Sequence, residues 1–227
     1  HPNQGSAKSR NIGIEAAQGK YITFLDDDDV YLMSKVKKQV EFMECGGYDY
    51  SVTDLVLYNE EGKEIDKRVR FYIKDTTINS LKVYHLKYHI TGTDTMMFRK
   101  DYLTKIGGFT PIDVGDEFYL MQKAIDNRGK FGYLPGCEIK AYVHTGENGL
   151  SSGEKKIQGE KALYEYKKNF FDGINLKTKR YIRMRHYAVL AFAYKRMGKI
   201  LKFLYYGAIG FLNAPIACSG LFFRRKI

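Results

Sequence analysis

Four consecutive aspartates, residues 26–29, follow directly on the apolar run 21–25 and constrain this sequence more than any other feature. The run is β-branched and aromatic, which is typical of a strand. Adjacent carboxylates repel one another, so stability alone does not explain them at the end of a strand. A bound Mg²⁺ or Mn²⁺ offsets this repulsion, because it takes oxygen ligands from one or two carboxylates and from substrate phosphates. Asp26 and Asp28 lie two apart and project to the same side of an extended chain. The alternatives are a solvated acidic loop or a weak Ca²⁺ site.

Strand-like and helix-like segments alternate through the first 145 residues or so. This alternation predicts an α/β layer fold with a mostly parallel sheet. A short helix of small residues before residue 19 feeds the first strand. Lys8 and Arg10 lie near the start of that helix, where backbone N–H groups also favour anions such as phosphates. Solvation of both bases is the alternative. The expected helices are 33–43, 79–88, 99–106 and 116–125, and the expected strands are 48–58, 65–73, 91–98 and 130–135.

Length and cysteine usage exclude several classes of protein. The chain has 227 residues, of which 44% are hydrophobic, enough for one domain of ordinary size and an appendage. Cys45, Cys137 and Cys218 lie far apart with no paired spacing. They therefore predict neither a disulfide framework nor a zinc site, and they favour a reducing compartment.

The net charge of +11 is concentrated in the C-terminal part of the chain. From Lys155 onward there are 17 Lys and Arg against 3 Asp and Glu, whereas the remainder has 20 against 23. Residues 203–223 carry no charge, and Pro215 interrupts them, which favours two short helices lying in a membrane interface. A membrane span and a plain helical cap are the alternatives. We expect one domain over residues 1–150 and a basic helical tail over 151–227.

Several motifs agree in order and spacing with one known family. They are the run from Asn3 through Arg10, Asn11, Gly13 and Gly19 to Asp26, Asp28 and Asp29; Lys35 and Gln39; the segment 97–100 with 107–109; the acidic helix start 116–120; and the segment 132–135. Over about residues 3–150 the chain resembles family 2 glycosyltransferases with the GT-A fold. The resemblance implies a three-layer α/β/α domain, followed here by the helical C-terminal tail. The family's usual first strand, helix and second strand, which hold the nucleoside, are expected to be missing before His1.

The resemblance also implies a reaction and its residues. The chain is expected to be an inverting, metal-dependent glycosyltransferase (hexosyltransferase type) that uses Mn²⁺ or Mg²⁺ and a nucleotide-diphosphate sugar. Asp28 would be the principal metal ligand, with Asp26 binding the metal, directly or through water, or the nucleotide. His144 would ligate the metal or donate to phosphate. The diphosphate carries negative charge as it leaves, and a fixed cation stabilises it.

A base must take the proton of the acceptor hydroxyl as it attacks. The family takes this base from the second residue of the later acidic pair, which is Glu117 here in place of the usual Asp. One added methylene moves the carboxylate, so Asp116 stays a candidate base. Alternatively, both acids simply stabilise the start of a helix.

The acceptor is expected to be a glycan or a lipid-linked hydroxyl in cell-surface polysaccharide biosynthesis, at the cytoplasmic face of an anionic membrane. An inactive carbohydrate- or nucleotide-binding remnant of the same fold is the main rival. An RNA-binding protein is disfavoured because aromatic and basic residues interleave only in the tail, with no RNA-binding signature.

Overall fold

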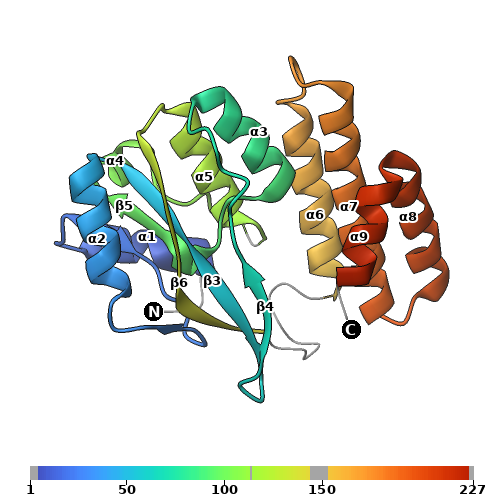
Figure 1. The fold of residues 1–227 in the computed structure, drawn as a ribbon, viewed down its shortest axis with the longest axis horizontal. Coiled ribbons are helices and arrows are strands. Elements are labelled where there is room, and N and C mark those ends of the chain that lie inside the picture. Colours follow the sequence, from blue (N-terminus) through green and yellow to red (C-terminus); the bar gives the residue numbers. More distant parts are fainter. Residues whose placement is uncertain (1–4, 113, 144–152, 225–227) are drawn as a thin grey trace. The chain divides into compact units, whose positions relative to one another are not determined.

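The computed structural model describes residues 5–112, 114–143 and 153–224 (Figure 1). The chain divides into two compact units, His1–Thr145 and Gly146–Ile227. The first unit is an α/β domain and the second is entirely helical in its described part.

The α/β unit alternates helices and strands much as the periodicity predicts. Most of the expected elements form within a few residues of their predicted bounds. In chain order they are α1 (Ser6–Ala16), β1 (Tyr21–Thr23), β2 (Val30–Tyr31), α2 (Lys35–Gly46), β3 (Tyr50–Asn59), β4 (Glu64–Arg68), α3 (Ile78–Tyr88), the 3₁₀ turn η1 (Thr93–Thr95), β5 (Met96–Arg99), α4 (Lys100–Lys105), α5 (Asp116–Asp126) and β6 (Phe131–Val143).

The six-stranded sheet is mixed, so the expectation of a mostly parallel sheet is wrong. Its order is β1-β5-β3-β6-β2, with β4 also paired to β3. Among the described strands only β3 and β6 run parallel, and the other neighbouring pairs are antiparallel. A helix between two strands does not by itself make them parallel, because direction depends on whether the connection returns to the same end of the sheet.

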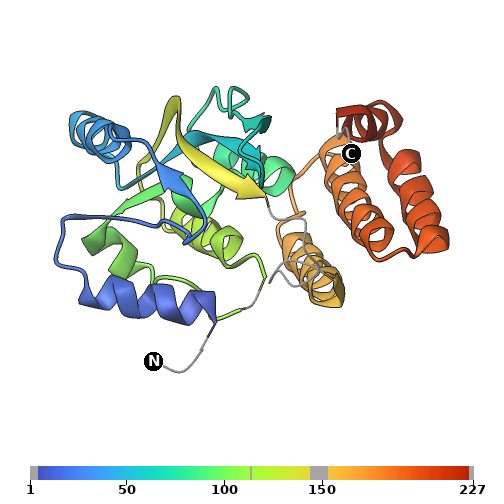
Figure 2. The same ribbon diagram turned by 90° about the horizontal axis from the view of Figure 1, so that it is seen from below.

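Helices cover both faces of this sheet, which confirms the three-layer α/β/α arrangement (Figure 2). Alternate side chains of β3 face opposite layers. Tyr50 and Val52 belong to the main core with residues of α1 and α5. Ser51, between them, faces α2 and accepts a hydrogen bond of 3.0 Å from Gln39.

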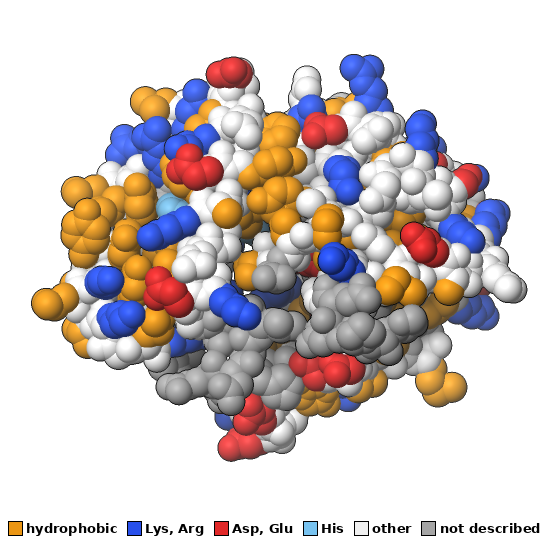
Figure 3. Space-filling model, turned by 180° about the vertical axis from the view of Figure 1, so that it is seen from behind, with side chains coloured by type: hydrophobic (Ala, Val, Ile, Leu, Met, Phe, Trp, Pro, Cys, Tyr) orange, Lys and Arg blue, Asp and Glu red, His pale blue; other side chains and the backbone are white. Residues whose placement is uncertain are grey.

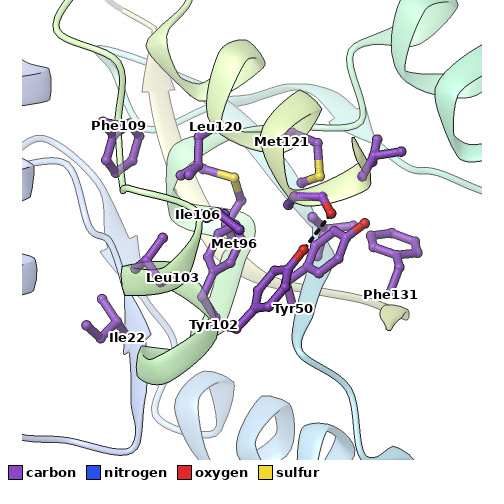
Figure 4. Close-up of a cluster of buried hydrophobic side chains, with 14 of the residues drawn as sticks. Ile22, Tyr50, Met96, Tyr102, Leu103, Ile106, Phe109, Leu120, Met121 and Phe131 are labelled. Carbon is purple, nitrogen blue, oxygen red and sulfur yellow. Dashed lines mark hydrogen bonds between the residues drawn. The ribbon is translucent and has the colours of Figure 1, made fainter. Parts of the chain in front are cut away.

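Aromatic rings fix β3, β5 and α4 against one another in the main core (Figure 4). The ring of the buried Tyr50 stacks on those of Phe98 and Tyr102, with ring centroids 5.7 Å and 5.8 Å apart, respectively. The Tyr102 hydroxyl donates to the Ala124 carbonyl oxygen at 2.6 Å, which attaches α5. Each fully buried side chain of this size contributes roughly 1.5–3 kcal/mol. The loops at the ends of these elements are therefore anchored on a well-packed core.

The second unit contains α6 (Gly153–Lys168), α7 (Leu176–Arg196), α8 (Ile200–Asn213) and α9 (Pro215–Arg224). The Asn175 side chain caps α7 by accepting the Thr178 N–H at 2.8 Å. Pro215 begins α9, where a missing N–H costs nothing, so the predicted break into two short helices is confirmed. No helix in the described part has both the length and the apolar character needed to cross a bilayer.

Candidate active site

The acidic loop 26–29 follows β1 and is held by β6 and η1. Within it, the Asp29 N–H donates to the Asp26 carbonyl oxygen at 3.1 Å. The Asp29 carboxylate accepts the Tyr142 N–H of β6 at 2.8 Å. The Asp26 N–H donates to the Asp94 carboxylate of η1 at 2.7 Å. The loop is therefore fixed between the ends of β1 and β6 and the start of β5.

Three carboxylates gather here: Asp26, Asp29 and Asp94 each offer an oxygen within 4.8 Å of the others. Burial, and then its hydrogen bond with Asp29, raises the pKa of Asp94 to about 7. Burial, and then the charge of Asp94, also raises the pKa of Asp26. We call these three residues the acidic trio. Burial disfavours their charged forms, and a hard divalent cation with oxygen ligands would stabilise those forms, so the acidic trio fits Mg²⁺ or Mn²⁺.

The other predicted ligands are Asp28 and His144. Asp28 is exposed and is not a member of the acidic trio. Its role as principal ligand stays a prediction. His144 lies outside the described residues. Beside the predicted Asp26, the trio contains Asp29 of the same loop and Asp94, which the sequence analysis missed.

Arg10 joins the acidic loop to the second acidic motif. Its Nη2 lies 2.7 Å from Asp26 Oδ1 and its Nη1 lies 2.8 Å from Asp116 Oδ2. Asp116 is the first residue of α5, more than a hundred residues from Arg10 in the chain. The two acidic motifs that the sequence singles out therefore lie on either side of one guanidinium. Lys8, the other predicted anion-binding base of α1, is exposed.

The two acids at the start of α5 have different partners. Asp116 is buried, its Oδ2 pairs with Arg10, and its Oδ1 accepts the Glu117 N–H at 2.9 Å. Burial, and then a hydrogen bond with Asp116, raises the pKa of Glu117 to about 7. Asp116 is thus held as an ion-paired carboxylate, whereas Glu117 is poised to gain or lose a proton near neutral pH.

Asn11, the neighbour of Arg10, fixes α1 against the segment 107–109. Its Nδ2 donates to the Phe109 carbonyl oxygen at 2.9 Å, and its Oδ1 accepts the Phe109 N–H at 2.8 Å. Gly108 has a φ of 55°, and a Cβ there would lie 2.5 Å from Asn11 Oδ1. Only glycine fits this close approach, which holds Arg10 in place between its two carboxylates.

Lys35 and Tyr31 hold the segments next to the acidic loop. Lys35, 1% exposed, donates to Thr23 Oγ1 at 2.7 Å, and its Nζ lies 3.9 Å from the centre of the Tyr31 ring. The Tyr31 hydroxyl donates to the carbonyl oxygens of Phe24 and Asp94, the latter at 2.9 Å. Burial lowers the pKa of Lys35 to about 7. These residues position the loop and do not face the acidic trio as ligands.

Arg70 fixes the backbone on both sides of Asp94. It is buried and donates to the Thr91 carbonyl oxygen at 2.8 Å and to Thr95 Oγ1 at 3.4 Å. Asp54 accepts the Arg70 N–H at 3.0 Å. The sequence signal for Asp94 is an acid within the small polar run 91–95, and its burial is known only from the structure.

The chain is similar to known glycosyltransferases. Residues 1–107 match the sequence model of glycosyl transferase family 2. An uncharacterized glycosyltransferase of Methanocaldococcus jannaschii is 28% identical over 164 residues, which is 72% of this chain and 54% of that protein. The minor teichoic acid biosynthesis protein GgaB of Bacillus subtilis is 23% identical over 176 residues, which is 75% of this chain and 19% of that protein.

A crystal structure of S. aureus TarS 1-349 in complex with UDP-GlcNAc shares the fold. It superposes with a TM-score of 0.53 at 15% sequence identity, covering 92% of this chain and 72% of that chain. The chain thus spans about half of the archaeal relative and a fifth of GgaB. The family match covers the acidic loop and ends before α5. The match over residues 1–107, the relatives and the fold support a family 2 glycosyltransferase with the GT-A fold, as the sequence predicts.

Proposed function

We propose that this chain transfers a sugar from a nucleotide-diphosphate donor to an acceptor hydroxyl, with inversion at the anomeric carbon and dependence on Mn²⁺ or Mg²⁺. The observation that carries the proposal is Arg10, which spans 2.7 Å to Asp26 and 2.8 Å to Asp116. It brings a carboxylate group suited to a cation and a carboxyl suited to proton transfer to one place. Those are the two functions that this transfer needs.

The acidic trio would hold the cation, with Asp28 and His144 as the further ligands that the family resemblance implies. A bound divalent cation neutralises the negative charge that the departing diphosphate develops. Other residues at this end of the site orient Asp26 and supply positive charge. Asp26 is oriented through its side chain by Arg10 and through its N–H by Asp94. Lys8, exposed on the same helix as Arg10, supplies a charge for the donor phosphates.

Glu117 would accept the proton of the attacking hydroxyl. Its pKa of about 7 leaves a useful fraction ionised at neutral pH and makes the protonated form stable once the proton is taken. Asp116, paired with Arg10, keeps a charge that helps hold Arg10 between the two motifs. An attack from the face opposite the leaving diphosphate inverts the anomeric carbon.

The acceptor proposed is a glycan or lipid-linked hydroxyl of a cell-surface polysaccharide. GgaB, named for minor teichoic acid biosynthesis, supports this acceptor, and TarS, crystallised with UDP-GlcNAc, supports a UDP-sugar donor. The basic helical unit would attach the enzyme to the cytoplasmic face of an anionic membrane. UDP is the nucleotide to test first.

The experiment is a pair of variants measured in two assays. Calorimetric titration with UDP and Mn²⁺ measures donor-site binding, and release of UDP from a panel of UDP-sugars measures turnover. Asp26→Asn should weaken the Mn²⁺-dependent binding of UDP, whereas Glu117→Gln should bind UDP normally and lose turnover. Glu41→Gln, an exposed change on α2, is the matched control. Full turnover in both site variants would overturn the proposal.

A further inference from the structure

An apolar groove runs between α8 and α9 in the helical unit. Its volume is about 480 Å³, within the range of roughly 300–1,000 Å³ that small-molecule sites occupy. Phe203, Leu204, Phe211 and Leu212 of α8 line one wall, and Phe222 of α9 lines the other. Leu204 is 57% exposed and Leu212 71% exposed, so the groove opens on a bare apolar surface. The site is shaped for a hydrocarbon chain.

Cations lie at both ends of this groove. Near the start of α8, Lys195 Nζ lies 5.7 Å from the centre of the Phe203 ring. At the end of α8, Arg180 donates to the carbonyl oxygens of Leu212 at 3.0 Å and Asn213 at 2.8 Å. On the face seen in Figure 3, hydrophobic side chains gather over α8 at the left-hand edge, with Lys and Arg side chains beside them. An apolar occupant with an anionic head fits both features.

The charge of the surrounding sequence selects among possible occupants. Residues 173–227 contain twelve Lys and Arg and no Asp or Glu. A second copy of this surface would bring like charges together, which opposes self-association through the groove. A bilayer of anionic lipid instead offers both the opposite charge and the hydrocarbon.

We propose that the groove between α8 and α9 takes up one acyl chain of an anionic phospholipid from a bilayer, with its head-group phosphate among the Lys and Arg side chains of α7 and α8. The inference rests on the membrane attachment in the proposed function and deepens it. The unit would then grip a single lipid chain, in addition to laying an amphipathic surface on the membrane.

Gly207 makes the groove deep enough for a chain. It lies inside α8 and lines the groove, and a Cβ added there would lie 3.8 Å from the Phe222 ring. A larger side chain at this position therefore fills the groove. Glycine weakens a helix interior, so replacing it also favours α8. Gly220, on α9, does not line the groove, and a Cβ there meets nothing within 4 Å.

These two glycines give a matched pair of variants. Gly207→Leu and Gly220→Leu add the same apolar side chain and the same helix propensity, but only the first fills the groove. The whole protein is mixed with vesicles of equimolar phosphatidylglycerol and phosphatidylcholine containing doxyl-labelled phosphatidylglycerol. Sedimentation measures the bound fraction, and electron paramagnetic resonance detects the acyl chains that the protein immobilises.

We expect the unaltered protein and Gly220→Leu to immobilise labelled chains and Gly207→Leu to lose that signal. The partition coefficient of Gly207→Leu into the vesicles should fall about tenfold, because each acyl methylene that no longer enters the groove lowers it about fourfold. Ala208→Leu, which fills the groove from another position of α8, should behave in the same way. All forms should bind vesicles of phosphatidylcholine alone more weakly.

Three results would overturn the inference. Gly207→Leu and Ala208→Leu that bind and immobilise lipid as well as the unaltered protein show that the surface inserts without using the groove. Equal binding of the protein to anionic and to neutral vesicles would show that the Lys and Arg side chains do not contribute. A dimer in analytical ultracentrifugation that Gly207→Leu abolishes assigns the groove to a second copy. Titration with UDP and Mn²⁺ separates this inference from the transferase proposal: lost UDP binding with lipid immobilisation intact refutes the transferase alone and leaves the groove in place.

Discussion

The two acidic motifs joined by Arg10 differ in what balances their charge. Asp116 is buried beside the guanidinium and holds an ion pair. The acidic trio shares the same guanidinium through Asp26 alone, and Asp94 and Asp29 instead share a hydrogen bond. The Asp116 charge is therefore balanced by an ion pair within the protein, whereas the acidic trio, with three carboxylates, is suited to a cation. One arginine thus lies between the candidate metal site and the candidate site of proton transfer.

Glu117→Gln tests the proton-transfer side and should have the largest effect. The amide keeps the size of the side chain and cannot accept the proton, so turnover should fall roughly 10²–10⁴-fold. Binding of UDP and Mn²⁺ should stay unchanged, because the acidic trio is untouched. Turnover close to normal, with Asp116→Asn inactive instead, would move the base to Asp116 and merge the two roles that Arg10 separates.

Asp94→Asn tests the metal side. Removing one carboxylate of the acidic trio should weaken the Mn²⁺-dependent binding of UDP by about 10–100-fold. Asp27→Asn is the matched control, because Asp27 is exposed in the same loop and outside the trio. Calorimetric titration at several Mn²⁺ concentrations measures both. An unchanged Asp94→Asn beside an inactive Asp28→Asn would restore Asp28 as the principal ligand and remove Asp94 from the site.

Arg10→Gln tests the link itself. The change leaves the buried Asp116 carboxylate without its partner, and we expect a loss of about 2 kcal/mol in the free energy of unfolding. Arg99→Gln is the control, because Arg99 pairs with Asp101 at 3.0 Å on the surface, where an ion pair contributes little. Urea denaturation compares the two. Equal stability of both variants would show that Arg10 only lies near the two motifs and does not hold them.

Local patterns in the sequence predicted what depends on neighbouring residues. The acidic loop after a strand, the acidic start of α5 and the break at Pro215 each follow from a few adjacent residues, and the structure has them where predicted. The motif order also gave the family and the layers of the fold. These features need no knowledge of which distant segments meet.

Long-range placement is what the sequence did not predict. Asp94 joins Asp26 across 68 residues, through the orientation of η1 that Arg70 fixes. The antiparallel position of β5 between β1 and β3 likewise depends on how the chain returns to the sheet. Arg10 was predicted to bind phosphate, yet two of its nitrogens contact carboxylates. In each case the partner lies in a distant segment, and a single sequence does not show which segments become neighbours.

The pH dependence of turnover gives the smallest expected effect. Burial and Asp116 raise the pKa of Glu117 to about 7, and a base acts only when it is deprotonated. Turnover at saturating donor should therefore rise with pH and level off above about 7, falling roughly tenfold for each pH unit below. Asp116→Asn removes the neighbouring charge that helps to raise this pKa, so its profile should shift toward lower pH. A profile that Asp116→Asn leaves in place would show that the proton acceptor is not the carboxyl next to the Arg10 ion pair.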